Sequence, residues 1–192
     1  MTLLILGIIL FLATHLIRVV APGFRLAMVD RFGIMGWRVI HSMLSLLSLV
    51  VLIWGYATAP VINVWFPPMG MNHLTTTLML FATICLVAGF LPAGHIATKT
   101  KHPMVLSIKI WAAAHLLANG DVRSILLFVA ILAWGVVLRI NYKRRLRAGD
   151  LVLRPFVSAR FDAIAVVLGL ALWALITFKL HEVLIGVAPL GM

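Results

Sequence analysis

Histidine is the residue type in this sequence best suited to chemistry inside a membrane. The chain holds seven histidines, one cysteine and five acidic residues among 192 positions. An ionisable side chain in an apolar segment is costly to bury and is usually paired or functional. Imidazole can move a proton near neutral pH, and it can ligate haem iron or another metal ion. The positions of the histidines therefore direct the search for a site.

Depth sorts the histidines into two sets. His15 and His41 lie roughly 8 Å from one end of their apolar segments at about 1.5 Å per residue, and His102 begins another segment at that end. His115 lies roughly 18 Å from that end by the same rise, in the half where His73 and His181 also belong. The sequence predicts that each set converges separately.

Helical spacing then assigns faces, because residues three, four and seven apart share one side of a helix. His41, Ser45 and Ser48 form one polar stripe. His115 stacks over Trp111, whereas His102 and Lys109 share a roughly opposite face. Lys109 is expected to extend its amine to the membrane surface, and the alternative is an anionic partner such as a haem propionate.

Two roles for these histidines follow from spacing alone. Axial imidazole ligation of haem suits an apolar bundle without a cysteine or acidic cluster. A hydrogen bond that ties two helices together is the more common role of a transmembrane histidine. A catalytic zinc ion fits less well, since the sequence contains neither an HxxxH nor an HExxH spacing.

The elements that must position these residues are membrane helices. Hydrophobic residues make up 64% of the chain, and its mean hydropathy is +1.15. Such a composition leaves too little polar surface for a soluble globule, so we expect the lipid bilayer to surround the protein. The net charge of +11 is then a signal of membrane topology and does not indicate a nucleic-acid partner.

The sequence predicts an all-α membrane protein, a single bundle of about six transmembrane helices in one domain over residues 1–192. The expected spans are Leu3 to Val20, Gly36 to Ala59, His73 to Leu91, Met104 to Ala118, Ile125 to Ile140 and Ala163 to Leu180.

Basic residues alternate between the connections. The first, third and fifth connections carry 13 of the 16 Lys and Arg residues. By the positive-inside rule these connections are cytoplasmic, so both termini are expected in the periplasm, and the protein in a bacterial inner membrane. The block from Lys143 to Arg147 would also attract anionic lipid, although a plain topology signal is the simpler interpretation.

Three polar positions lie near the ends of the spans. Asn119-Gly120-Asp121 can end a helix, with Gly120 in the left-handed conformation. Asp121 is alternatively an acceptor that orients His115 or His181. Asp162, among arginines, is expected to form an ion pair or to lie at a helix N-terminus.

Several motifs resemble the NnrU family of integral membrane proteins. The resemblance covers nearly the whole chain. The motifs are Phe11-Leu12-Ala13-Thr14-His15, His102-Pro103-Met104, the run from Trp111 through His115 to Asp121, and the tail from His181 to Leu190.

The resemblance implies a link to denitrification, in which NnrU proteins support nitrite and nitric oxide reduction. The family is also similar to the zeta-carotene isomerases, membrane enzymes that use haem b for a redox-dependent double-bond isomerisation. By this resemblance His15 and His115 match the haem-ligating or catalytic histidines. Ala112 stands where the isomerases have a Cys, so a mechanism that switches a thiolate ligand is not expected here.

The depth estimate and the resemblance conflict, since His15 and His115 differ in height by roughly 10 Å if both helices are straight. A tilted or deeper fourth span would bring them to one haem. Otherwise the axial pair is His15 with His41, or His115 forms a separate polar site with Asn119, Asp121 or His181.

Two classes of function remain. In the first, the protein binds haem b and senses nitric oxide, moves electrons or isomerises an apolar small molecule that enters from the lipid. In the second, it is a cofactor-free accessory or transport protein that supports the expression or assembly of nitrite and nitric oxide reductases. A homo-oligomer is compatible with either class. A methyltransferase, suggested by a short similarity at Lys101 to Met104, lacks the second half of such a site.

Overall fold

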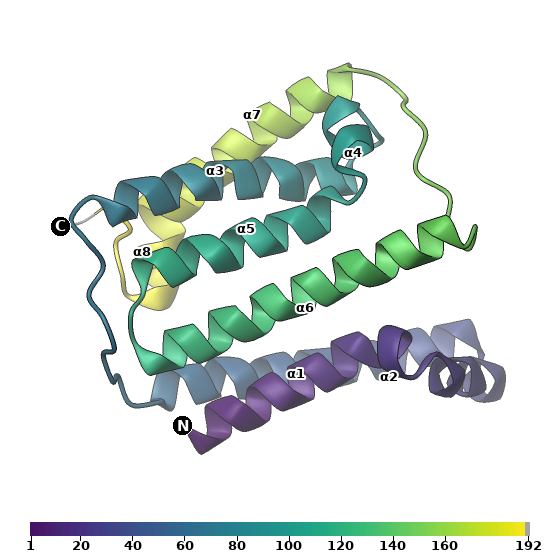
Figure 1. Cartoon of the computed structure of the whole chain (residues 1–192), viewed down its shortest axis with the longest axis horizontal. Coiled ribbons are helices and arrows are strands. Elements are labelled where there is room, and N and C mark those ends of the chain that lie inside the picture. The colour runs from purple at the N-terminus through teal and green to yellow at the C-terminus, as the bar shows by residue number, and fades with distance from the viewer. Residues whose placement is uncertain (191–192) are drawn as a thin grey trace. The chain divides into compact units, whose positions relative to one another are not determined.

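A computed structural model of the chain describes residues 1–190 and confirms the all-α class (Figure 1). Within these residues there is no β-strand, and one isolated bridge joins Asn63 to Asp121. The elements in chain order are α1 (Thr2–Val20), α2 (Pro22–Thr58), α3 (Met71–Phe90), α4 (His95–Thr100), α5 (Pro103–Ala118), α6 (Val122–Arg147), α7 (Arg160–Leu175), the π-helix η1 (Ile176–Leu180) and α8 (His181–Ile185).

Five helical segments of the described chain are long and apolar enough to cross a membrane. They are α1, α2, α3, α6 and the continuous run Arg160–Ile185. Helix α5 is also apolar but has only 16 residues. The protein is therefore a multi-pass membrane protein, while the count of six crossings stays a prediction.

Three expected boundaries differ from the structure. The first connection is helical, because Pro22 begins α2 and the helix kinks at Gly33, whose φ is 72°. The basic block at Lys143 belongs to α6, which continues to Arg147 since nothing in that stretch breaks a helix. The last span continues beyond Leu180 to Ile185.

The helices form two compact units. Unit 1 comprises Met1–Val64 and Asp121–Ala130, and unit 2 comprises Trp65–Gly120 and the chain from Ile131 onward. Helix α6 contributes its first residues to unit 1 and the remainder to unit 2. The expectation of a single domain over residues 1–192 stays a prediction.

Unit 1 is built on a close contact between α1 and α2. A Cβ atom at Gly55 would lie 2.6 Å from the backbone nitrogen of Leu4, so only glycine permits this approach. Leu4, Leu52 and Ala59 form the buried cluster beside it. Small residues at helix crossings allow backbones to approach and gain van der Waals contact, which drives helix association in lipid.

Unit 2 places α3 between α5 and α7, as Figure 1 shows. The Thr75 hydroxyl donates to the Ala114 carbonyl at 3.2 Å, and the Trp173 indole nitrogen donates to the Thr76 carbonyl at 2.8 Å. Both bonds join α3 to a neighbouring helix. These bonds hold α5, the helix that carries His115, in a defined position.

Candidate histidine sites

His15 and His41 form a pair inside unit 1. Their ring centroids lie 6.2 Å apart, with ring planes at 68°. The His15 Nδ1 donates to the Phe11 carbonyl at 2.8 Å, and its ring stacks on the Phe11 ring at 4.0 Å between centroids. A protonated Nδ1 leaves Nε2 as the nitrogen that carries the lone pair. The structure thus brings together two of the three histidines that depth predicted to converge, whereas the third, His102, packs against Tyr142 within unit 2.

Both ring nitrogens of His41 have a partner, one on α1 and one on its own helix α2. Its Nε2 donates to the Thr14 carbonyl of α1 at 3.3 Å, and its Nδ1 lies 3.5 Å from the Ser45 hydroxyl. Ser48 is buried on the same stripe of α2. His41 therefore ties α2 to α1, the structural role that spacing favoured.

His115 and His181 form a second pair, inside unit 2. Their ring centroids lie 6.4 Å apart, and the ring planes are within 26° of parallel. The His115 Nδ1 donates to the Trp111 carbonyl at 2.8 Å, and the His181 Nδ1 donates to the Val187 carbonyl at 2.7 Å. Each ring therefore has a fixed tautomer with the lone pair on Nε2, the arrangement that metal-ligating histidines adopt.

Local chain geometry presents His181 to this pair. The π-helix η1 ends at Leu180, immediately before His181, and π-helical turns are often found at functional sites. After α8, Gly186 adopts a left-handed conformation with φ of 79°. That turn returns the Val187 carbonyl to His181, where it accepts the imidazole proton.

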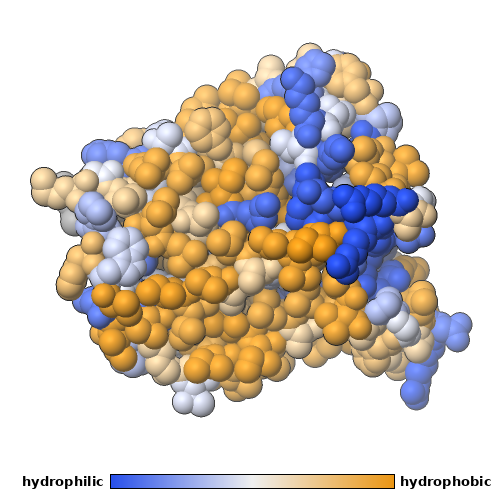
Figure 2. Space-filling view, in the orientation of Figure 1, coloured by the Kyte–Doolittle hydropathy of each residue, from blue (hydrophilic) through white to orange (hydrophobic). Residues whose placement is uncertain are grey.

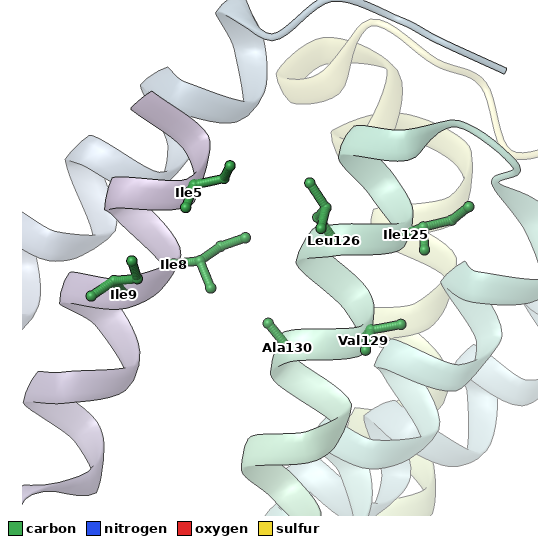
Figure 3. A pocket seen from close by; sticks show the side chains of 7 residues that line it. All are labelled: Ile5, Ile8, Ile9, Ile125, Leu126, Val129 and Ala130. Atoms are coloured by element: carbon green, nitrogen blue, oxygen red, sulfur yellow. The ribbon is translucent and has the colours of Figure 1, made fainter. Parts of the chain in front are cut away.

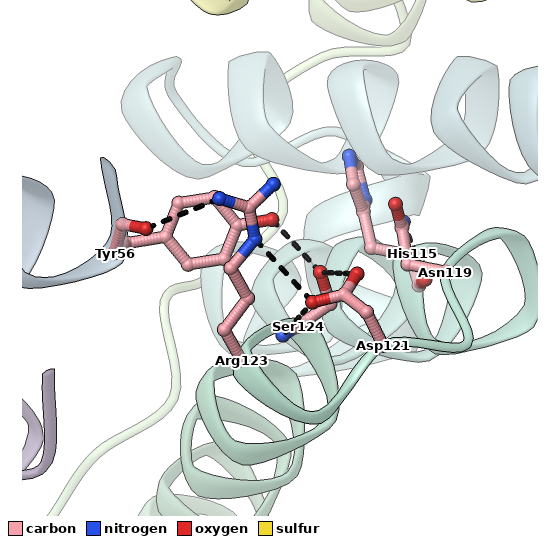
Figure 4. Close-up of polar contacts among 6 residues, drawn as sticks. All are labelled: Tyr56, His115, Asn119, Asp121, Arg123 and Ser124. Atoms are coloured by element: carbon pink, nitrogen blue, oxygen red, sulfur yellow. Dashed lines mark hydrogen bonds and ion pairs between the residues drawn. The ribbon is translucent and has the colours of Figure 1, made fainter. Parts of the chain in front are cut away.

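Asn119 and Gly120 have other roles than those predicted. The Asn119 amide donates to the His115 carbonyl at 2.8 Å and therefore satisfies the end of α5 rather than the imidazole (Figure 4). The expected left-handed conformation at Gly120 is wrong. This glycine is required because a Cβ atom there would overlap the backbone carbonyl of Trp65. The backbone nitrogen of Trp65 in turn donates to the Gly120 carbonyl at 3.2 Å.

Asp121 lies in a polar network of unit 1 (Figure 4). Its carboxylate accepts bonds from the Ser124 hydroxyl at 2.6 Å and the Ser124 backbone nitrogen at 3.1 Å, and it lies 3.4 Å from Arg123. The Tyr56 hydroxyl bonds Ser124 at 2.8 Å, and the Arg123 guanidinium lies over the Tyr56 ring. Asp121 thus fixes the start of α6 to the end of α2.

The remaining candidates lie near the surface of unit 2. The His102 ring packs against Tyr142 with centroids 3.8 Å apart. Burial, with help from the positive charges of Arg139 and Arg154, lowers the pKa of His102. The aliphatic chain of Lys109 packs on Gly135 of α6, which fits the expected extension of its amine along the helix surface.

Asp162 lies where one alternative placed it, at a helix N-terminus. Its carboxylate accepts bonds from the backbone nitrogens of His95 and Ile96 at 2.7 and 2.9 Å. These nitrogens begin α4, so the carboxylate satisfies orphan donors of that helix.

Residues 1–190 contain no group of three or more His, Cys, Asp or Glu side chains placed to hold a metal ion. The two histidine pairs are therefore the candidate ligand sets. An apolar groove of about 320 Å³ in unit 1, between α1 and the start of α6, has no charged lining residue (Figure 3). It offers no ligand for a metal ion or an anion.

A family model described as NnrU protein matches residues 3–189. The chain belongs to the NnrU family. No curated protein and no solved structure matched the chain. The family match covers all four histidines of the two pairs.

One signal in this NnrU family sequence was missed. An aromatic residue precedes each anchoring histidine by four positions, Phe11 before His15 and Trp111 before His115. In both cases its carbonyl accepts the imidazole proton and its ring contacts the imidazole. The i, i+4 spacing would have identified this repeated arrangement. No periodicity indicated the roles of η1, Tyr56 or Ser124.

Proposed function

We propose that this NnrU family protein binds haem b in the membrane, and that His115 and His181 would hold its iron. The observation that carries the proposal is the fixed tautomer of both rings at a centroid distance of 6.4 Å. One iron atom held by the Nε2 atoms of both rings, at about 2 Å per bond, would be compatible with this separation. The residues present thus fit bis-histidine ligation.

Haem bound there would supply one-electron exchange, and its iron would be open to nitric oxide only when one of the two imidazoles was released. The chain orients the two imidazoles through hydrogen bonds. The Nδ1–H group of His115 donates to the Trp111 carbonyl, and that of His181 donates to the Val187 carbonyl. Such bonds raise the basicity of a ligating imidazole and prevent its rotation.

The family resemblance adds to the proposal a link to nitric oxide metabolism in denitrification, or a redox-dependent isomerisation of an apolar substrate. His15 is the second candidate ligand, because its own Nδ1 is bonded as in His115. Position 112 of α5 is a fully buried alanine. Because alanine has no thiol, this position offers no thiolate to an isomerase mechanism.

The proposed setting is a bacterial inner membrane, crossed six times with both termini in the periplasm. The short helix α5 would be the sixth crossing, at about 24 Å for its 16 residues. The charge of the connections supports this orientation.

A second candidate function is a cofactor-free accessory protein for nitrite or nitric oxide reduction. The observation that favours it is His41, whose Nε2 joins α2 to α1 while its Nδ1 contacts Ser45 of its own helix. If the other histidines serve the same purpose, the bundle is a scaffold for partner proteins.

Absorption spectra of detergent-purified protein, oxidised and then reduced with dithionite, distinguish the two functions. The proposal expects a Soret band that His115→Ala and His181→Ala abolish. The matched control is His73→Ala, since His73 is exposed and bonds through its backbone. Loss of the band in His15→Ala and His41→Ala alone would assign the haem to unit 1. A protein without haem, even after incubation with hemin, would leave the accessory function.

A further inference from the structure

A basic pocket lies at the C-terminal end of α6 in unit 2. Its volume is about 240 Å³, and its lining consists of Lys101, Arg139, Tyr142, Lys143, Leu146 and Arg147. Figure 2 shows hydrophilic side chains gathered toward this end of α6, while much of the same face is hydrophobic. Four cationic side chains converge on one small cavity, which a topology signal alone does not require.

The charges of this pocket are not neutralised by the protein. In residues 1–190 the one ion pair is between Arg123 and Asp121, which are outside the pocket. No carboxylate of the described residues lies within 4.0 Å of Lys101, Lys143 or Arg147. An anion that entered the pocket would therefore meet several unpaired positive charges.

The frame of the pocket is held by specific bonds. The Arg139 guanidinium donates to the Thr100 carbonyl at 3.2 Å, and the Tyr142 hydroxyl donates to the Lys101 carbonyl at 3.3 Å. Lys101 has a φ of 63°, a left-handed conformation that residues with a side chain seldom adopt. These contacts join α6 to the turn between α4 and α5 and fix the backbone of Lys101 at the pocket.

The pocket continues into an apolar track on α6. Val136 and Ile140 are 42% and 44% exposed, which leaves room for a neighbour. They share a helix face with Lys143 and Arg147, because these four residues are spaced by four, three and four positions. A molecule that matches this face carries an anionic group at one end and a hydrocarbon chain at the other.

We propose that this pocket binds the phosphate of an anionic glycerophospholipid, with an acyl chain along Val136 and Ile140. Lysine and arginine side chains near a membrane surface attract anionic headgroups, and basic pockets between helices bind them specifically. The apolar track favours a lipid over a soluble phosphate compound, which would leave that track uncovered. This proposal is independent of haem binding.

Native mass spectrometry of the full-length protein in detergent, titrated with phosphatidylglycerol or phosphatidylcholine, tests the proposal. The wild type should retain phosphatidylglycerol preferentially. The double variant Lys143→Gln with Arg147→Gln should weaken this binding roughly thirtyfold. Lys99→Gln with Arg144→Gln removes the same charge from exposed positions outside the pocket and should change the affinity roughly twofold or less.

Equal weakening in both double variants would overturn the proposal, because binding would then depend on net charge alone. A wild type without preference for phosphatidylglycerol would also overturn it. Glycerol phosphate and inorganic phosphate serve as soluble competitors. Displacement of the lipid by either one at micromolar concentration would assign the pocket to a soluble phosphate instead. An unchanged elution volume and circular dichroism spectrum establish that each variant is folded.

Discussion

The two histidine pairs differ in what their second member does. Both pairs have centroids just over 6 Å apart, and both begin with a histidine bonded to an aromatic residue four positions earlier. In unit 1 the second member, His41, bonds another helix through one ring nitrogen and contacts Ser45 with the other. In unit 2 the second member, His181, bonds a carbonyl six residues along its own chain.

This difference indicates that the hydrogen-bond partner, rather than the distance, separates a histidine that joins two helices from the one that we propose as a ligand. His41 stabilises the contact of α1 with α2, so its ring has no lone pair to spare for a metal ion. The bond of His181 sets only its own tautomer and orientation. The spacing of the two pairs is nearly the same, but the hydrogen bonds of their second members differ.

The largest effect is expected from a backbone change that separates His115 from His181 in unit 2. Deletion of Phe178, an exposed residue of η1, turns the following residues by about 100° relative to α7 and should remove His181 from His115. We expect complete loss of the haem Soret band. Phe178→Ala keeps the register and should retain the band. If the deletion variant binds haem normally, His181 is not a ligand.

A packing change should break the unit 1 pair and spare unit 2. Gly55→Leu places a side chain against the Leu4 backbone and is expected to destabilise unit 1 by about 3 kcal/mol. Denaturant unfolding in detergent, followed by tryptophan fluorescence, measures this loss. Gly23→Leu is the matched control, since an added Cβ there meets nothing within 4 Å. Haem absorbance that falls in parallel with unit 1 stability would contradict assignment to unit 2.

A substitution in the polar network at the start of α6 tests whether unit 1 affects the proposed ligands in unit 2. Asp121→Ala removes the acceptor of the buried Ser124 hydroxyl and the partner of Arg123, and should cost about 2 kcal/mol. Thermal unfolding measures the loss. Asp150→Ala, at an exposed position, should leave stability unchanged. Because Asp121 bonds residues of unit 1, the haem spectrum of Asp121→Ala should match the wild type; a shifted Soret band would show that Asp121 acts on the ligands.

The smallest effect concerns a histidine outside both pairs. The pKa of His102 is lowered by burial and by Arg139 and Arg154, so the unfolded chain binds a proton more readily than the folded chain. Stability should therefore fall slightly as the pH drops below about 6.5, the ordinary histidine value. Melting temperatures between pH 5 and 8 test this, and His102→Phe should flatten the profile. An unchanged slope in that variant would assign the pH dependence to other groups.

Some of the site could be found in the sequence because local periodicity determines it. The stripe of His41, Ser45 and Ser48 and the stacking of His115 over Trp111 depend only on the turn of an α-helix, and the structure shows both. Depth alone also grouped His115 with His181. The Asp121 network could not be predicted, because Tyr56 bonds Ser124 across 68 positions of sequence and no local rule connects them.

Composition by itself determines that the chain is a multi-pass helical membrane protein, and its motifs place it in the NnrU family. Burying so many apolar side chains in lipid requires helices, whose backbone groups bond internally. Only the tertiary structure decides which histidines meet and which nitrogen each one has available. That choice depends on the close approach of α1 and α2 at Gly55, which joins distant segments, and on the π-turn before His181, which no periodicity indicated.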